Sequence, residues 1–108
     1  MDLTQKHCVP CEGGVAPFDS EKIKLYQPGL SLPWDIIEGK KLRHEFKFKT
    51  FPQAIEFVNK IVPVAEAEGH HPDLHIYYNK VLVELWTHAI GGLSENDFIM
   101  AAKIEALV

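Results

Sequence analysis

The sequence has 108 residues, of which 46% are hydrophobic and 24% charged, and its formal net charge is −4 at pH 7. This length and composition are typical of one globular domain, so we expect residues 1–108 to form a single unit. The acidic balance, with no Lys/Arg cluster beyond residues 40–49, argues against a nucleic-acid-binding surface. No apolar run approaches the ~20 residues that span a bilayer, and the N-terminus lacks the apolar stretch of a signal peptide. We therefore expect a cytoplasmic protein with neither a membrane nor a nucleic acid as partner.

Residues 1–18 contain a Gly-Gly pair and two prolines, which predicts an N-terminal loop segment. The two cysteines of the chain, Cys8 and Cys11, lie in it as CVPC directly after His7. Two thiols and one imidazole do not complete a tetrahedral zinc site, and no strand precedes the pair as in a redox CxxC motif. We interpret the pair as part of the loop, with a disulfide or a metal contact as the alternative.

The middle of the chain predicts a short helix, a hairpin and a long helix. Asp19 or Ser20 can cap the short helix, which ends at Pro28-Gly29. Apolar residues between positions 34 and 37 then precede a turn signal at residues 38–40, and from Phe46 onward the polarity alternates with a period of two, which we interpret as an antiparallel hairpin. A long helix begins after Thr50 and continues to Gly69, with apolar residues at helical spacing. Pro63 inside this helix predicts a kink or a break.

The last third predicts a second hairpin and a last helix. Residues 74–78 and 81–88 alternate around Asn79-Lys80, which we take as the turn. Residues 94–97, Ser-Glu-Asn-Asp, cap the last helix. The order α-β-β-α-β-β-α predicts an α+β fold in which a four-stranded antiparallel sheet carries three helices on one face.

The stretch EGHHPD, residues 68–73, places two histidines where the long helix stops. Pro72 excludes helical geometry for His71, so we expect the rings of His70 and His71 to be splayed at a helix-to-strand corner. A hairpin centred on Asn79-Lys80 pairs residue 79−n with residue 80+n, which places His71 opposite His88. The sequence therefore predicts that His70, His71 and His88 gather at one end of the sheet.

Three clustered histidines have three interpretations at this stage. They can hold zinc with an open coordination position. They can act in general acid–base catalysis, because imidazole both gives and takes a proton near pH 7. They can also simply pack and bind backbone carbonyls.

The residues from Glu66 to His88, E-A-E-G-H-H-P-D-L-x-I-x-Y-N-K-V-x-V-x-L-W-T-H, resemble the pterin-4a-carbinolamine dehydratase family. The C-terminal G-G-L-S-E-N-D, Trp34 and the E-G pair at residues 38–39 are also similar to that family. The N-terminal C-V-P-C-E-G-G-V-A-P resembles its bacterial-type members. The resemblance covers nearly the whole chain.

The resemblance implies a fold of four antiparallel strands with helices on one face, and assembly as a homodimer or homotetramer. It implies dehydration of 4a-hydroxytetrahydropterin to the quinonoid dihydropterin, which recycles the cofactor of aromatic amino acid hydroxylases. It implies that neither a metal nor an organic cofactor takes part, which favours the acid–base interpretation of the histidines.

The resemblance also implies roles for particular residues. His70 and His88 are expected to transfer protons, His71 to bind and orient the pterin, and Glu66 to polarise or charge-stabilise a histidine ring from one helical turn before His70. The remaining expected substrate contacts are Pro72, Asp73 and Trp34. For Trp34, stacking on the pterin and plain core packing are both open.

The chain departs from the family pattern at two positions. Animal members carry an acidic residue directly before the first histidine, where this chain has Gly69, and either Glu68 or Asp73 is a candidate substitute. Pro63 lies in the helix that the family uses for oligomer packing, which leaves the mode of association open.

Two other functions compete with the dehydratase hypothesis. Animal members of the family also act as dimerisation cofactors of a homeodomain transcription factor, so a binding module without chemistry is one alternative. The sequence gives no sign of that partner. A metal-dependent hydrolase that uses the three histidines is the other.

Overall fold

The computed structural model of the chain describes residues 2–10 and 13–108. Its helices are α1 (Ser20–Tyr26), α2 (Phe51–Glu68) and α3 (Glu95–Glu105), and its strands are β1 (Asp35–Ile37), β2 (Lys41–Lys47), β3 (Asp73–Tyr77) and β4 (Lys80–Leu85). Three short 3-10 helices, η1 (Leu3–Gln5), η2 (Gln27–Gly29) and η3 (His88–Ile90), complete the list. The first of these lies within the predicted N-terminal loop and buries Leu3.

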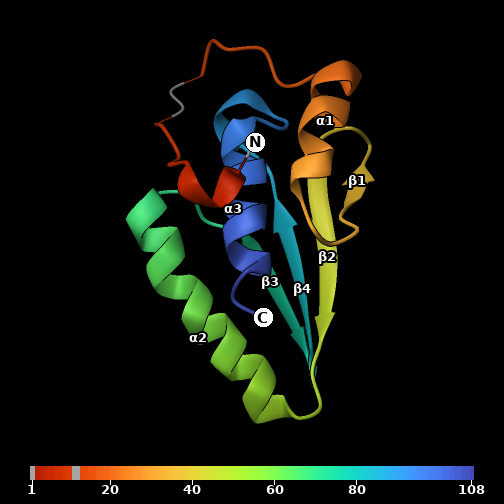
Figure 1. Ribbon diagram of the computed structural model, residues 1–108, viewed down its shortest axis with the longest axis vertical. Helices are drawn as coiled ribbons and strands as arrows, with labels where there is room; N and C mark the ends of the chain where they lie inside the picture. Colours follow the sequence, from red (N-terminus) through yellow and green to blue (C-terminus); the bar gives the residue numbers. More distant parts are fainter. Residues whose placement is uncertain (1, 11–12) are drawn as a thin grey trace.

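The four strands form one antiparallel sheet in the order β1-β2-β4-β3, and the three α-helices lie on one face of it (Figure 1). This confirms the predicted α+β fold and the order of its elements. None of the helices in the described part of the chain is long and apolar enough to cross a membrane.

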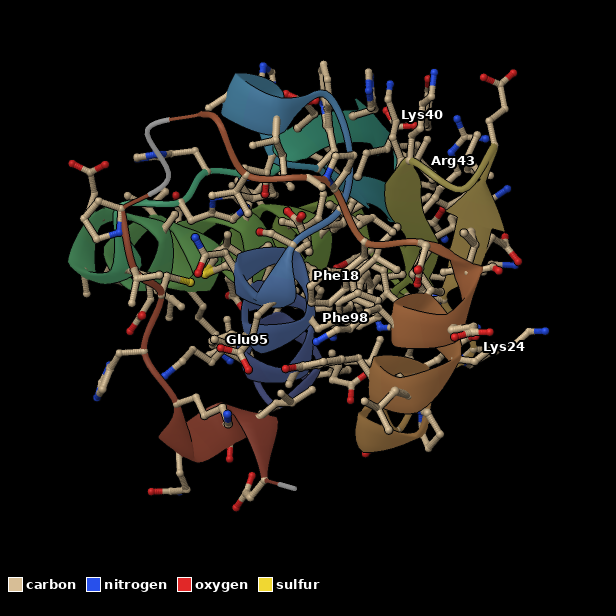
Figure 2. All side chains as sticks on the ribbon, turned by 90° about the horizontal axis from the view of Figure 1, so that it is seen from above. Phe18, Lys24, Lys40, Arg43, Glu95 and Phe98 are labelled. Atoms are coloured by element: carbon tan, nitrogen blue, oxygen red, sulfur yellow. The ribbon has the colours of Figure 1, made fainter. Side chains whose placement is uncertain are left out.

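The core lies between the helices and the sheet. On β4, Val81, Val83 and Leu85 point inward, as the predicted alternation requires. Almost every residue of α3 is buried, and α2 contributes its inner face. Seen from above, Phe18 and Phe98 lie together between α1 and α3, with ring centroids 6.0 Å apart (Figure 2).

Two local predictions need correction or refinement. The helix α2 runs through Pro63 without a break, and Pro63 lies on its exposed side. The turn of the second hairpin is Tyr78-Asn79 and not Asn79-Lys80, because Tyr77 pairs with Lys80 and Asp73 with Glu84.

The hairpin register shifts because the turn is fixed from outside the hairpin. Tyr78 takes a left-handed φ of 53°, and Asn79 is held at the end of β2, where its side-chain amide and its carbonyl bind the carbonyl and the N–H of Phe48. Continued at this register, position 71 would lie opposite 86, so the predicted pairing of His71 with His88 is wrong. His88 instead lies beyond the end of β4, in η3.

Candidate active site

A hollow of about 480 Å³ opens at the end of the sheet where α2 and β4 end and α3 begins. It is lined by residues 9–10, 68–73, 86–89 and Asn96. The predicted cluster of His70, His71 and His88 is therefore present in one cavity, although the hairpin register that suggested it is different.

The end of α2 separates the two adjacent histidines. Gly69 takes the left-handed conformation, with φ 65°, and closes the helix with an N–H to Ala65 carbonyl bond. The chain then turns into the extended segment that Pro72 imposes. As a result, the His70 side chain points inward and is only 13% exposed, whereas that of His71 is 59% exposed.

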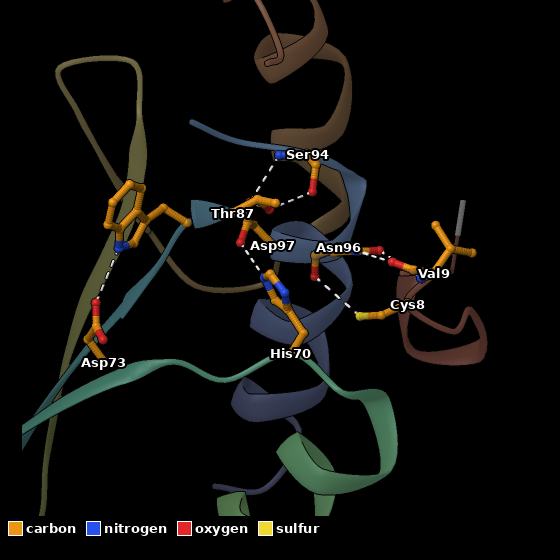
Figure 3. A network of polar contacts seen from close by, with 9 residues as sticks. Cys8, Val9, His70, Asp73, Thr87, Ser94, Asn96 and Asp97 are labelled. Atoms are coloured by element: carbon orange, nitrogen blue, oxygen red, sulfur yellow. Dashed lines mark hydrogen bonds and ion pairs between the residues drawn. The ribbon is translucent and has the colours of Figure 1, made fainter. Parts of the chain in front are cut away.

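The inward ring of His70 binds a buried carboxylate. Its Nε2 lies 2.6 Å from Oδ1 of Asp97, whose side chain is fully buried (Figure 3). The other oxygen of Asp97 accepts hydrogen bonds from the Thr87 hydroxyl, at 2.8 Å, and from the Ser94 N–H, at 2.9 Å. Ser94 and Asp97 also form the capping box that starts α3.

This network fixes the tautomer of His70. An ionised carboxylate only accepts hydrogen bonds, so Nε2 of His70 must carry a proton. Nδ1 has no hydrogen-bond partner among the described residues, and no buried side-chain nitrogen or oxygen in that part of the chain is unpaired. Nδ1 is therefore accessible from solvent.

The expected contact between Glu66 and His70 is not formed. Glu66 instead lies beside His71, with Oε2 at 2.5 Å from Nε2. Both side chains are more than half exposed, so their ion pair contributes at most about 1 kcal/mol to stability. Glu66 can orient and charge-stabilise the ring of His71, whereas the partner of His70 is Asp97.

The third histidine stacks on an indole. The rings of His88 and Trp86 lie with centroids 3.9 Å apart and planes inclined by 28°. Trp86 Nε1 donates a hydrogen bond to Asp73 Oδ2 at 3.2 Å, which ties the start of β3 to the segment after β4. Pro72 and Asp73, both expected as substrate contacts, line the hollow.

Trp34 does not line the hollow. It is 3% exposed, packs on His44 and Phe46, and donates from Nε1 to Glu105 at 3.0 Å. Trp34 is thus a core residue, which is the second of the two alternatives. It lies directly before β1, where its ring packs against Phe46 and away from the hollow. The indole at the hollow is that of Trp86.

A segment of the N-terminal loop borders the hollow. The Cys8 N–H donates to Glu68 Oε1 at 2.7 Å, and this hydrogen bond lowers the pKa of Glu68. Burial, reinforced by the negative charges of Glu68 and Asp97, raises the pKa of the Cys8 thiol to about 12. Cys11 lies outside the described residues. Over residues 2–10 and 13–108, no group of three His, Cys, Asp or Glu side chains is placed to hold a metal ion.

Sequence reasoning missed Asp97, Thr87 and Trp86 as site residues. Asp97 was visible only as part of a helix cap and of the G-G-L-S-E-N-D stretch, and its partner His70 lies 27 residues away. Thr87 and Trp86 were visible only within the strand–turn–strand motif, which assigned neither of them a role in the site.

Comparison with known proteins identifies the family of the chain. Residues 16–107 match the family described as Pterin 4 alpha carbinolamine dehydratase. A protein of Rickettsia bellii, provisionally named a pterin-4-alpha-carbinolamine dehydratase, is 49% identical over 97% of this chain and 93% of its own length. One of Halorhodospira halophila, with the same provisional name, is 48% identical over 99% and 98%.

Solved structures show the same fold. The crystal structure of a transcriptional coactivator/pterin dehydratase from Brucella melitensis has a TM-score of 0.78 and 32% identity over 84% of this chain and 97% of its own. A pterin dehydratase-like RuBisCO assembly factor of the alpha-carboxysome has a TM-score of 0.61 at 22% identity over 71% and 90%, which shows the fold alone. The chain thus belongs to the pterin-4a-carbinolamine dehydratase family of enzymes.

Proposed function

We propose that this chain eliminates water from 4a-hydroxytetrahydropterin to give the quinonoid dihydropterin, and so recycles a tetrahydropterin cofactor for aromatic amino acid hydroxylases. The observation that carries the proposal is the His70–Asp97 pair at the hollow, with His71 and His88 around the same cavity. The proposed chemistry uses imidazole groups and no metal.

The reaction needs two proton transfers. The C4a–oxygen bond breaks as the hydroxyl leaves, and a proton delivered to that oxygen makes water the leaving group. The proton on N5 is removed, and its bonding electrons form the C4a=N5 double bond. One acid and one base, each effective near neutral pH, therefore account for the whole elimination, and each contributes about 10²–10⁴-fold to the rate.

In this proposal, His70 is the base. Asp97 holds the proton of Nε2, so the lone pair of Nδ1 is available to take the N5 proton. The imidazolium that forms then faces a carboxylate at 2.6 Å, which stabilises its charge.

His88 is the proposed acid. It lies on an exposed 3-10 helix, where solvent can restore the proton that it gives to the hydroxyl. Stacking on Trp86 fixes the plane of its ring. His71, paired with Glu66, binds and orients the pterin, and Pro72 and Asp73 contact it at the corner.

The test is turnover of freshly generated 4a-hydroxytetrahydropterin, followed by the absorbance of the quinonoid product, for the wild type and His70→Ala. We expect kcat to fall by about 10²–10⁴-fold in the variant. His75→Ala is the matched control, because His75 binds Glu84 on the outer face of the sheet and does not line the hollow. Wild-type turnover no faster than the spontaneous reaction would refute the proposed function, and loss of activity in a chelator would refute the metal-free chemistry.

We propose that the chain assembles as a homodimer or homotetramer. Phe51 and Val62 are 47% and 52% exposed on α2, and Ile76 and Tyr77 are 41% and 57% exposed on the edge strand β3. Apolar side chains of this size at the surface favour burial against a second copy. Light scattering on a sizing column tests this, and a strictly monomeric mass at micromolar concentration would contradict it.

A further inference from the structure

Val9 and Pro10 form one side of the hollow, although they precede every predicted site residue by more than 50 positions in the chain, Trp34 apart. Val9 and Pro10 line the cavity, and the Val9 side chain is 66% exposed. The other side of the cavity carries imidazoles and carboxylates. The exposed apolar side chains of Val9 and Pro10 can therefore pack against a flat heterocycle whose polar groups face the imidazoles and carboxylates.

Asn96 holds this segment through both polar groups of one backbone unit. Its Oδ1 accepts the Val9 N–H at 3.0 Å, and its Nδ2 donates to the Val9 carbonyl at 2.7 Å (Figure 3). The Asn96 side chain is buried, with 5% of the residue exposed, so the two bonds are formed away from solvent. The side-chain amide of Asn96 thus binds both the N–H and the carbonyl of Val9, in the way that a residue of a neighbouring strand binds its partner in an antiparallel sheet.

Glu68 provides a second attachment one residue earlier. It accepts the Cys8 N–H at 2.7 Å, and its other oxygen contacts His7 Nδ1 at 3.0 Å and Lys103 Nζ at 3.5 Å. Both anchors are adjacent to the proposed catalytic pair, because Asn96 precedes Asp97 and Glu68 lies two residues before His70. The position of the segment is thus set by the same elements that set the base.

We propose that Val9 and Pro10 form a substrate-contacting wall of the pterin pocket, and that Asn96 is a positioning residue for this wall. The inference rests on the proposed function. The wall makes its contacts with the pterin ring system and takes no part in proton transfer, so it stabilises the bound substrate and the transition state to the same extent. Contacts of that kind affect KM and leave kcat unchanged.

The first test compares Asn96→Ala with Asn79→Ala in steady-state kinetics. Asn79→Ala is the matched control, because it removes a side-chain amide to backbone carbonyl bond of 2.8 Å, to Phe48, far from the hollow. We expect Asn96→Ala to raise KM about 5–20-fold with kcat within about twofold, and Asn79→Ala to leave both within about twofold. An unchanged KM in Asn96→Ala, or a fall in kcat without a rise in KM, overturns the inference.

A second variant and a binding measurement separate this inference from the proposed function. Val9→Ala shortens the wall at an exposed position without touching either anchor, so it tests the wall even where Asn96→Ala fails to fold. Its Kd for 6-methyl-7,8-dihydropterin, measured by fluorescence, should rise about 2–5-fold. A wild type that binds this pterin but has no turnover refutes the dehydratase and leaves the wall testable. A Kd that does not change in Val9→Ala refutes the wall alone.

Discussion

The substitution Asp97→Asn separates the proposed catalytic role of the Asp97 carboxylate from its structural role. The asparagine has the same shape, and its oxygen can still accept from Thr87 and the Ser94 N–H. Its amide NH₂ then faces Nε2 of His70, where the carboxylate accepted a proton at 2.6 Å. Nε2 must become the acceptor, so the neutral ring carries its proton on Nδ1 and is no longer a base toward the hollow.

The expected loss of activity is large. General acid–base catalysis contributes about 10²–10⁴-fold, and the same substitution next to the catalytic histidine of serine proteases lowers kcat about 10⁴-fold. We therefore expect kcat to fall at least about 100-fold, measured as quinonoid formation from 4a-hydroxytetrahydropterin.

The expected loss of stability is moderate. Charge-assisted bonds to Thr87 and Ser94 become neutral ones, at about 1 kcal/mol each, and α3 loses a negative charge in its first turn, worth about 0.5 kcal/mol. The sum, about 2–3 kcal/mol, is measurable by urea unfolding. Glu105→Gln is the control on the same helix, because Glu105 also accepts three hydrogen bonds, from Ser31, Leu32 and Trp34, but lies away from the hollow. Asp97→Asn with kcat within threefold of the wild type, or an equal loss of kcat in Glu105→Gln, would refute the reasoning.

Three further outcomes follow from the structure. The Cys8 amide holds the pKa of Glu68 below its ordinary value of 4.5, so the unfolded chain binds this proton more readily. The stability from Glu68 is therefore complete above pH 4.5 and lost as the pH falls through the folded pKa, and thermal melts of Glu68→Gln should show a smaller loss of Tm over that acid range than the wild type. With a pKa of about 12, the Cys8 thiol at pH 8 has about 1,000-fold less thiolate than it would have at the ordinary pKa of 9.0. Each thiolate of higher pKa is a better nucleophile, which offsets part of this loss. Alkylation of Cys8, followed by mass spectrometry, should therefore be about 30- to 60-fold slower in the folded than in the unfolded chain. Tyr78→Gly relieves a left-handed φ of 53° at a residue that is 70% exposed, so it should stabilise the fold by about 1 kcal/mol and raise Tm by several degrees; a lower Tm would show that the side chain matters more than the strain.

Local signals were sufficient for most of the fold. Thr50 with the apolar period that follows predicted the start and the face of α2, Asp19 or Ser20 the start of α1, and residues 94–97 the start of α3. The structure has Thr50, Asp19 and Ser94 as the N-caps. The turn at Tyr78-Asn79 could not be predicted in the same way. Tyrosine does not favour φ > 0, and the residue that holds the turn, Asn79, is bound to Phe48 at the end of another strand. A turn that is fixed by tertiary contacts has no signature in its own four residues.

The site shows the same division between local and distant signals. The gathering of His70, His71 and His88 was predicted from the hairpin register and holds although that register is wrong, because both ends of the hairpin stay at one end of the sheet. The partner of His70 did not follow, because position 66 is the right distance from position 70 only while the helix continues, and α2 ends at Glu68.

Asp97, the carboxylate that binds His70 in place of Glu66, connects the proposed catalysis to folding. Asp97 caps α3, accepts the Thr87 hydroxyl just after β4, and binds the ring just after α2, so its four lone-pair sites are shared among three elements. If any of the three leaves its place, the fully buried carboxylate loses one of its hydrogen bonds, and a hydrogen bond to a charged group is worth about 1.5–3 kcal/mol. The geometry of His70 therefore forms only when the two helices and the hairpin have docked, and local opening of any one of them removes the base together with its support. This is why we expect the activity of destabilised variants to follow the population of the fully docked state, and why Asp97→Asn is the substitution that should separate the two.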